Sequence, residues 1–144
     1  MESTITLLLA CLLGVALAEN VTYHVWNNPI PEKVVRNPGQ VFSVPKGRTF
    51  GDVMNVAAEQ NPTEYRYTYI QYDFGRLFTG IGGVSQDPGN NRYWVLFKLG
   101  EELNAKNPPN NKNLTEYGAD GTFVENNDIF LFWLTDGSIR PRHS

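Results

Sequence analysis

The sequence predicts an α+β fold, with a mixed β-sheet and a single main helix arranged in the manner of a β-grasp. Short β-prone segments are separated by clusters of Gly, Pro and Asn, which is typical of strands joined by turns. One stretch, residues 49–60, instead places its apolar residues at helical spacing. No internal repeat and no linker divides the chain, so we expect one domain.

Residues 1–18 are expected to be a signal peptide. Residues 5–17 form a nearly uncharged apolar run, and Ala16-Leu17-Ala18 is the small-x-small pattern that signal peptidase accepts. The run is shorter than the roughly 20 residues that a membrane-spanning helix needs, and a buried N-terminal helix is the alternative. We therefore expect a secreted, extracellular protein with a domain at residues 19–144 and a short disordered tail from about residue 136.

Composition excludes several classes of partner. The only cysteine, Cys11, lies in the predicted signal peptide, so we expect no disulfide and no cysteine-bound metal. The net charge is −3 and no basic patch is visible, which argues against nucleic acid or an anionic membrane as partner. Two sequons, which begin at Asn20 and Asn113, are candidate glycosylation sites.

The first half of the domain is expected to hold two strands and the helix. Residues 21–25 alternate apolar and polar side chains, and residues 41–44 form a second short strand between turn residues. The helix begins at Thr49, where Asp52 stands at the capping-box position, and it ends before Pro62.

The second half is expected to be strands. Residues 104–113 form a polar loop, and the last strand is apolar on both faces, so we expect it in the centre of a sheet. In order along the chain, the expected strands are 65–70, 77–81, 93–99, 122–124 and 128–134.

No catalytic or metal site is expected, so the chain is not predicted to be an enzyme. It carries no GxSxG, HExxH or phosphate-loop motif. Outside the predicted signal peptide its histidines are His24, on a strand, and His143, near the C-terminus. The remaining candidates for a functional site are aromatic side chains on the predicted strands. Most aromatic side chains fill a core, and we expect the same for most of these, although some could face a pocket or a partner.

Two segments resemble the C-terminal domain of the transcobalamin and intrinsic factor family. NPTEYRYTYIQYDFGRLFTGIGG is similar to a family segment that ends in an aromatic-Gly turn and a short apolar strand. NRYWVLFKL is similar to the Tyr-Trp strand of the family, and the flanking strands and the helix match in order. The resemblance covers about residues 20–135.

The resemblance implies a corrinoid ligand, cobalamin, and no cofactor of the protein's own. In the family this small domain closes over one face of the corrin ring, while a larger helical domain holds the other. Val95 stands where the family commonly has glutamine, and Leu103 is the nearest apolar residue in the following loop. Carried over by position, the corrinoid-binding residues are Phe74, Gly75, Tyr93, Trp94, Val95 and Leu103.

This sequence shows no counterpart of the helical domain. We therefore expect either weaker corrinoid binding, or a second chain or a homodimer that completes the site. The alternative is a secreted recognition module that keeps the fold and binds no corrinoid.

Overall fold

The computed structural model describes residues 18–34 and 39–139. The predicted signal peptide, apart from Ala18, and residues 140–144 of the predicted tail lie outside the described residues. Within the described ranges, no helix is long and apolar enough to cross a membrane.

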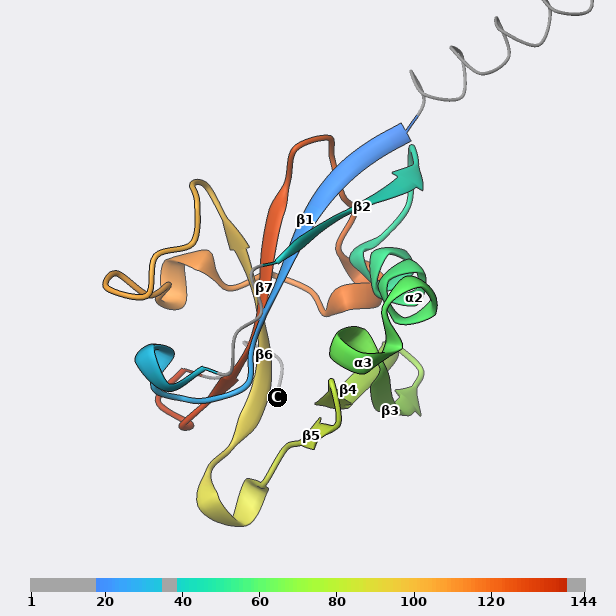
Figure 1. The fold of residues 1–144 in the computed structure, drawn as a ribbon. Helices are drawn as coiled ribbons and strands as arrows, with labels where there is room; N and C mark the ends of the chain where they lie inside the picture. Colours follow the sequence, from blue (N-terminus) through green and yellow to red (C-terminus); the bar gives the residue numbers. More distant parts are fainter. Residues whose placement is uncertain (1–17, 35–38, 140–144) are drawn as a thin grey trace, which may run out of the picture.

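A four-stranded mixed sheet forms the centre of the fold (Figure 1). The first and last strands of the chain lie parallel in the middle, and the outer pairs are antiparallel. This order confirms the predicted α+β class and its β-grasp character. The strands, in spatial order, are β2 (Gln40–Pro45), β1 (Ala18–Trp26), β7 (Ile129–Thr135) and β6 (Tyr93–Leu99).

A second, three-stranded sheet lies on the same side of the large sheet as the main helix (Figure 1). It contains β3 (Tyr67–Tyr72), β4 (Gly75–Ile81) and β5 (Val84–Ser85). The helices are α2 (Phe50–Gln60) and the short α3 (Pro62–Tyr65). Four 3₁₀ turns complete the described elements: η1 (Pro31–Lys33), η2 (Pro88–Asn90), η3 (Asn111–Asn113) and η4 (Ala119–Gly121).

Helix α2 begins where the sequence predicts. The backbone N–H of Asp52 donates to Oγ1 of Thr49 over 3.3 Å, and the N–H of Thr49 donates to Oδ2 of Asp52 over 3.0 Å. This reciprocal pair is the capping box, which satisfies backbone donors that the first helical turn leaves unpaired.

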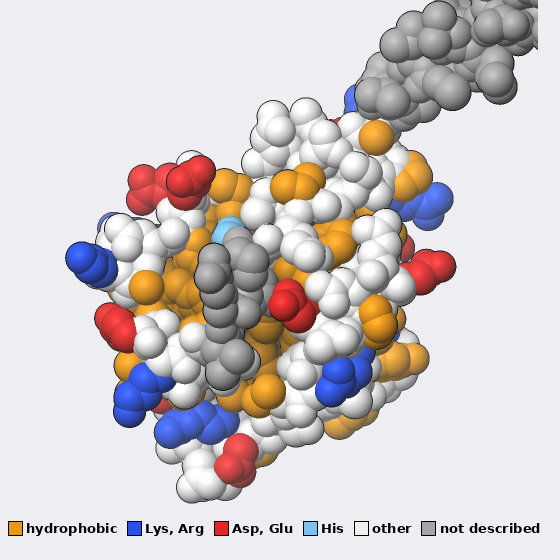
Figure 2. Space-filling view, viewed as in Figure 1, with side chains coloured by type: hydrophobic (Ala, Val, Ile, Leu, Met, Phe, Trp, Pro, Cys, Tyr) orange, Lys and Arg blue, Asp and Glu red, His pale blue; other side chains and the backbone are white. Residues whose placement is uncertain are grey.

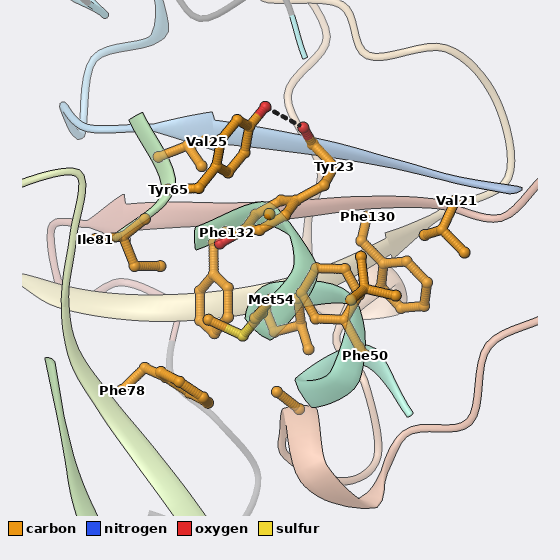
Figure 3. Packing of buried hydrophobic residues seen from close by; sticks show 14 of the residues in the cluster. Val21, Tyr23, Val25, Phe50, Met54, Tyr65, Phe78, Ile81, Phe130 and Phe132 are labelled. Carbon is orange, nitrogen blue, oxygen red and sulfur yellow. Dashed lines mark hydrogen bonds between the residues drawn. The ribbon is translucent and has the colours of Figure 1, made fainter. Parts of the chain in front are cut away.

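The main core lies between α2, the small sheet and one face of the large sheet (Figure 3). Phe50 and Met54 of α2 are fully buried against Phe130 and Phe132 of β7. The rings of Phe50 and Phe130 are 4.4 Å apart. Aromatic burial on this scale lets a chain of this size form a core without disulfides.

A smaller core covers the other face of the large sheet. It is centred on Trp26 and Trp133, whose rings meet edge to face at 5.2 Å. Loops rather than a second layer of helices cover it, and several of its apolar side chains are only partly buried. The view in Figure 2 accordingly shows hydrophobic side chains at the surface, close to the histidine coloured pale blue.

The structure corrects three expectations about local structure. Tyr65 is not in a strand, because Asn61 caps the short helix α3 and directs Tyr65 into the core, where its hydroxyl donates to the Tyr23 carbonyl over 2.9 Å. Residues 122–124 form no strand, and Phe123 makes only an isolated bridge to Thr49. Ile139 packs against the smaller core, so residues 136–139 are not a free tail.

Candidate ligand pocket

An apolar pocket of about 400 Å³ lies where the small sheet meets the edge of the large sheet. One wall comes from the β3–β4 hairpin, residues 74–78, and the floor from residues 94–96 of β6 with Phe132 of β7. The opposite wall is the segment 114–121, which precedes and includes η4. The volume is typical of pockets that hold small organic ligands.

The hairpin wall carries exposed apolar side chains. Phe74, in the two-residue turn, is 71% exposed, and its ring stacks on Tyr72 at 5.2 Å. Gly75 has a φ of 130°, and a Cβ at this position would lie 3.0 Å from Cβ of Asp120. Gly75 therefore allows both the turn and the close approach of the opposite wall.

The floor of the pocket is held firmly. Trp94 is only 5% exposed, and its indole N–H donates to the Val84 carbonyl over 3.0 Å. Its ring meets that of Phe132 edge to face at 6.4 Å, and Phe132 in turn meets Phe78 at 6.0 Å. A hydrogen-bonded indole in an aromatic cluster is fixed in one orientation.

An ion pair joins the two walls. The guanidinium of Arg76 donates to both carboxylate oxygens of Asp120, from Nε over 2.9 Å and from the second terminal nitrogen over 2.7 Å. The backbone N–H of Arg76 donates to the same carboxylate over 2.8 Å. The remaining terminal nitrogen donates to Oδ1 of Asn55 in α2 over 2.8 Å. Fork-shaped pairs of this kind fix geometry as well as charge.

These contacts shift both pKa values. The hydrogen bond from Arg76 lowers the pKa of Asp120, and the same bond raises the pKa of Arg76. The guanidinium also lies 5.0 Å from the ring centre of Phe78 and 5.4 Å from that of Tyr67, within the range of cation–π attraction. Arg76 is thus a structural residue at the rim of the pocket.

The opposite wall is a short turn that is tied to itself and to β6. The hydroxyl of Thr122 donates to the Gly118 carbonyl over 2.9 Å, and the hydroxyl of Thr115 donates to the Tyr117 carbonyl over 2.6 Å. The N–H of Thr115 donates to the Leu96 carbonyl over 3.3 Å. Tyr117 stands exposed at the mouth.

The structure brings four of the six predicted binding residues to this pocket. Phe74, Gly75, Trp94 and Val95 line it. Tyr93 and Leu103 do not, and both pack against the smaller core on the other face of the large sheet.

Strand geometry explains this division. Successive side chains of a strand point to opposite faces, so Tyr93 and Trp94 cannot both face the pocket. Trp94 belongs to the main core and Tyr93 packs on the smaller one. Val95 has its side chain in the smaller core as well, although it borders the pocket.

Sequence reasoning missed Arg76, Leu77, Tyr117 and Asp120, which also line the pocket. Leu77 and Tyr117 could have been found only from their neighbours in space, because neither stands in a motif. The pairing of Arg76 with Asp120 spans 44 positions of the chain and leaves no local signal.

The glycosylation candidates differ in their surroundings. Asn20 is exposed on β1, and its side-chain oxygen accepts from the Ser43 hydroxyl over 2.5 Å. Asn113 is half-buried in η3, where its side-chain oxygen accepts from the N–H of Asn110 over 3.2 Å. Occupancy of both sites stays a prediction.

Titratable side chains do not gather into a metal site in the part of the chain that the structure describes, where no group of three or more His, Cys, Asp or Glu could hold an ion. His24 lies outside the pocket. Burial lowers its pKa, and the charge of Glu102 raises it to a smaller extent.

Comparison with known proteins finds likeness in fold and partial likeness in sequence. No family model matches the chain. An uncharacterised protein of Drosophila melanogaster, CG3556, is 28% identical over 122 residues, which is 81% of this chain. The chain spans only 19% of the length of that relative.

Among solved structures, haptocorrin in complex with Cbi aligns over 83% of this chain at 19% identity, with a TM-score of 0.64. This chain covers 25% of haptocorrin. A protein of Ruminococcus gnavus also aligns over 83% of this chain and 97% of its own, at 19% identity, with a lower TM-score of 0.47. The described domain therefore shares its fold with about a quarter of haptocorrin.

Proposed function

We propose that this chain is a secreted protein that binds a corrinoid through the pocket between the β3–β4 hairpin and the segment 114–121. The observation that carries the proposal is that this apolar pocket lies in a fold shared with part of haptocorrin, a protein solved with the corrinoid Cbi. The sequence resemblance to the transcobalamin and intrinsic factor family points to the same class of ligand. The predicted signal peptide and sequons support the extracellular part of the proposal.

The lining suits a large ligand with an apolar face. A corrin is a broad, nearly planar ring, larger than a pocket of about 400 Å³. We therefore expect one edge of the ring to enter the pocket and its face to rest on Phe74 and Leu77. Both side chains are exposed, and both residues line the pocket together with Trp94.

One-sided contact limits affinity. Affinity depends on how completely the contact is desolvated, and a ligand held on one face stays partly hydrated. We expect a Kd on the order of micromolar for the isolated chain. A second chain that covered the other face would strengthen binding.

Calorimetric titration of the wild-type chain and of two variants, with Cbi and with cobalamin, tests the proposal. Phe74 is the test position and Phe123 is the control, because the two side chains are alike and similarly exposed. Phe74 lines the pocket and is 71% exposed, whereas Phe123 lies outside it and is 68% exposed. Phe74→Ala should weaken binding about three- to tenfold through the lost aromatic contact, and Phe123→Ala should leave the Kd unchanged.

Two results of this titration would contradict the proposal. If both substitutions weaken binding equally, the pocket is not the site. If neither corrinoid binds at about 1 mM, the affinity is too weak for a carrier, and the alternative of a recognition module without a corrinoid ligand is favoured.

A further inference from the structure

Strand β3 is an edge strand whose outer side is open. It pairs with β4 alone, and no other described segment is bridged to it. All of its residues from Thr68 to Tyr72 are exposed, and the strand lies at the edge of the small sheet (Figure 1).

The strand lacks most of the usual protection of an edge. Its sequence, YTYIQY, contains no charge, no proline and no glycine, and natural edge strands use such residues to prevent pairing with other chains. The two edges of the large sheet carry more protection. Strand β2 ends in Pro45, next to Lys46, and β6 is bridged to Leu114 through Phe97.

The direction of the outward backbone groups follows from the hairpin. A two-residue turn joins Tyr72 to Gly75, and residues that flank such a turn form a hydrogen-bonded pair. The next pair, Gln71 and Arg76, therefore points its backbone groups away from the hairpin. The hydrogen bonding of Arg76 supports this direction, because its backbone N–H donates to Asp120 instead of to β3. Backbone groups alternate in direction along a strand, so the N–H and C=O of Tyr69 point outward in the same way as those of Gln71.

We propose that two copies of this chain pair antiparallel through the outer edge of β3. In the register that joins the outward groups, Tyr69 lies opposite the partner's Gln71, and Ile70 lies opposite the partner's Ile70 on the two-fold axis. Each Tyr69–Gln71 pair then exchanges backbone hydrogen bonds. The two three-stranded sheets become one continuous sheet.

The side chains suit this register. Ile70 is 48% exposed and is already paired with Leu77 on β4. In the dimer the two Ile70 residues form a non-hydrogen-bonded pair about 4.5 Å apart between Cα atoms, the closest type of cross-strand pair. The irregularity between Thr68 and Tyr69 lies outside the residues that pair.

The composition of β3 favours a second copy of this chain as the partner at its outer edge. An uncharged strand does not repel its own copy, and the register is self-complementary about Ile70. A charged peptide would find no opposite charge within residues 67–72 to fix its register.

Sedimentation velocity over a concentration series, without ligand, tests the dimer. The wild-type chain should be a dimer with a Kd on the order of 10–100 µM. Ile70→Lys places two like charges opposite each other and should weaken the dimer at least about tenfold. Gln71→Pro removes an outward N–H, leaves the β3–β4 hydrogen bonds intact, and should do the same.

Val41→Lys is the matched control, because Val41 is a β-branched residue on the edge strand β2 and is 63% exposed. It should leave the dimer intact, and circular dichroism should show that all three variants stay folded. A wild-type chain that is monomeric at about 1 mM overturns the proposal. So does a dimer that survives both β3 substitutions, or one that Val41→Lys dissociates equally. None of these results bears on corrinoid binding.

Discussion

Tyr23 carries a hydroxyl that is fully buried and has no hydrogen-bond partner among the described residues. Burial raises the pKa of Tyr23 well above its ordinary value, so the hydroxyl stays protonated. The ring itself packs at 4.7 Å from Tyr65 and 4.9 Å from Phe50. The ring therefore stabilises the core, while the desolvated hydroxyl costs free energy.

Tyr23→Phe should consequently leave the free energy of unfolding unchanged or raise it by about 1 kcal/mol, because the ring stays and the unpaired group is removed. Urea unfolding of the two proteins measures the difference. As a control, Tyr65→Phe removes the hydroxyl that donates to the Tyr23 carbonyl over 2.9 Å, and it should destabilise the protein. A loss of more than about 1 kcal/mol in Tyr23→Phe would show that its hydroxyl does have a partner.

At the scale of elements, the pair of Arg76 and Asp120 joins β4 to η4 and reaches α2 through Asn55. Gly51, in the first turn of α2, belongs to the same arrangement, since a Cβ there would collide with the Asp120 carboxylate. The helix, the hairpin and the wall of the pocket thus meet at one charged contact.

Asp120→Asn should lower the free energy of unfolding at neutral pH by about 1 kcal/mol, a modest value because both side chains are partly exposed. The pKa of Asp120 is lower in the folded chain than in the unfolded one, so its stabilisation is complete above the unfolded pKa of about 4 and is lost as the pH falls further. Urea unfolding at a series of pH values should show a shallower acid dependence in the variant. An identical acid dependence in both proteins would exclude this role.

The elements that the sequence predicted correctly are those with local signals. The capping box at Thr49 and Asp52 and the apolar alternation of β1 act between residues close in the chain, so they can be read from it. Tyr65 precedes β-prone residues that predict a strand, but the cap at Asn61 starts a short helix that includes it. Residues 122–124 have strand-like composition but lack a partner strand, and pairing is a long-range property.

At the scale of the whole molecule, the pocket was only partly predictable. Phe74 and Gly75 follow from the hairpin turn, and Trp94 follows from an apolar strand, so the resemblance could place them together. The facing wall at 114–121 comes from a polar loop whose position depends on Asp120 and on contacts with β6. Such contacts form only when the chain has folded. The alternation that directs Tyr93 away from the pocket is instead local, and it follows from the predicted strand at residues 93–99 once Trp94 is assigned to the pocket side.

The domain corresponds to only part of each of two known proteins that it resembles. It shares its fold with about a quarter of haptocorrin and aligns with about a fifth of the Drosophila relative. We expect weak, one-sided binding because a corrin is larger than the pocket between the two walls and the floor, so this domain would cover only part of the ring.

Mapping of backbone amide shifts by nuclear magnetic resonance during a titration with Cbi tests the central claim most directly. We expect the amides of residues 74–78 and 114–121 to shift in proportion to bound ligand, because these segments form the two walls of the pocket. The amides around Trp26, whose side chain lies in the core on the opposite face of the large sheet, should stay unchanged. Shifts confined to that opposite face, or no shifts at a ligand concentration of about 1 mM, would contradict the account.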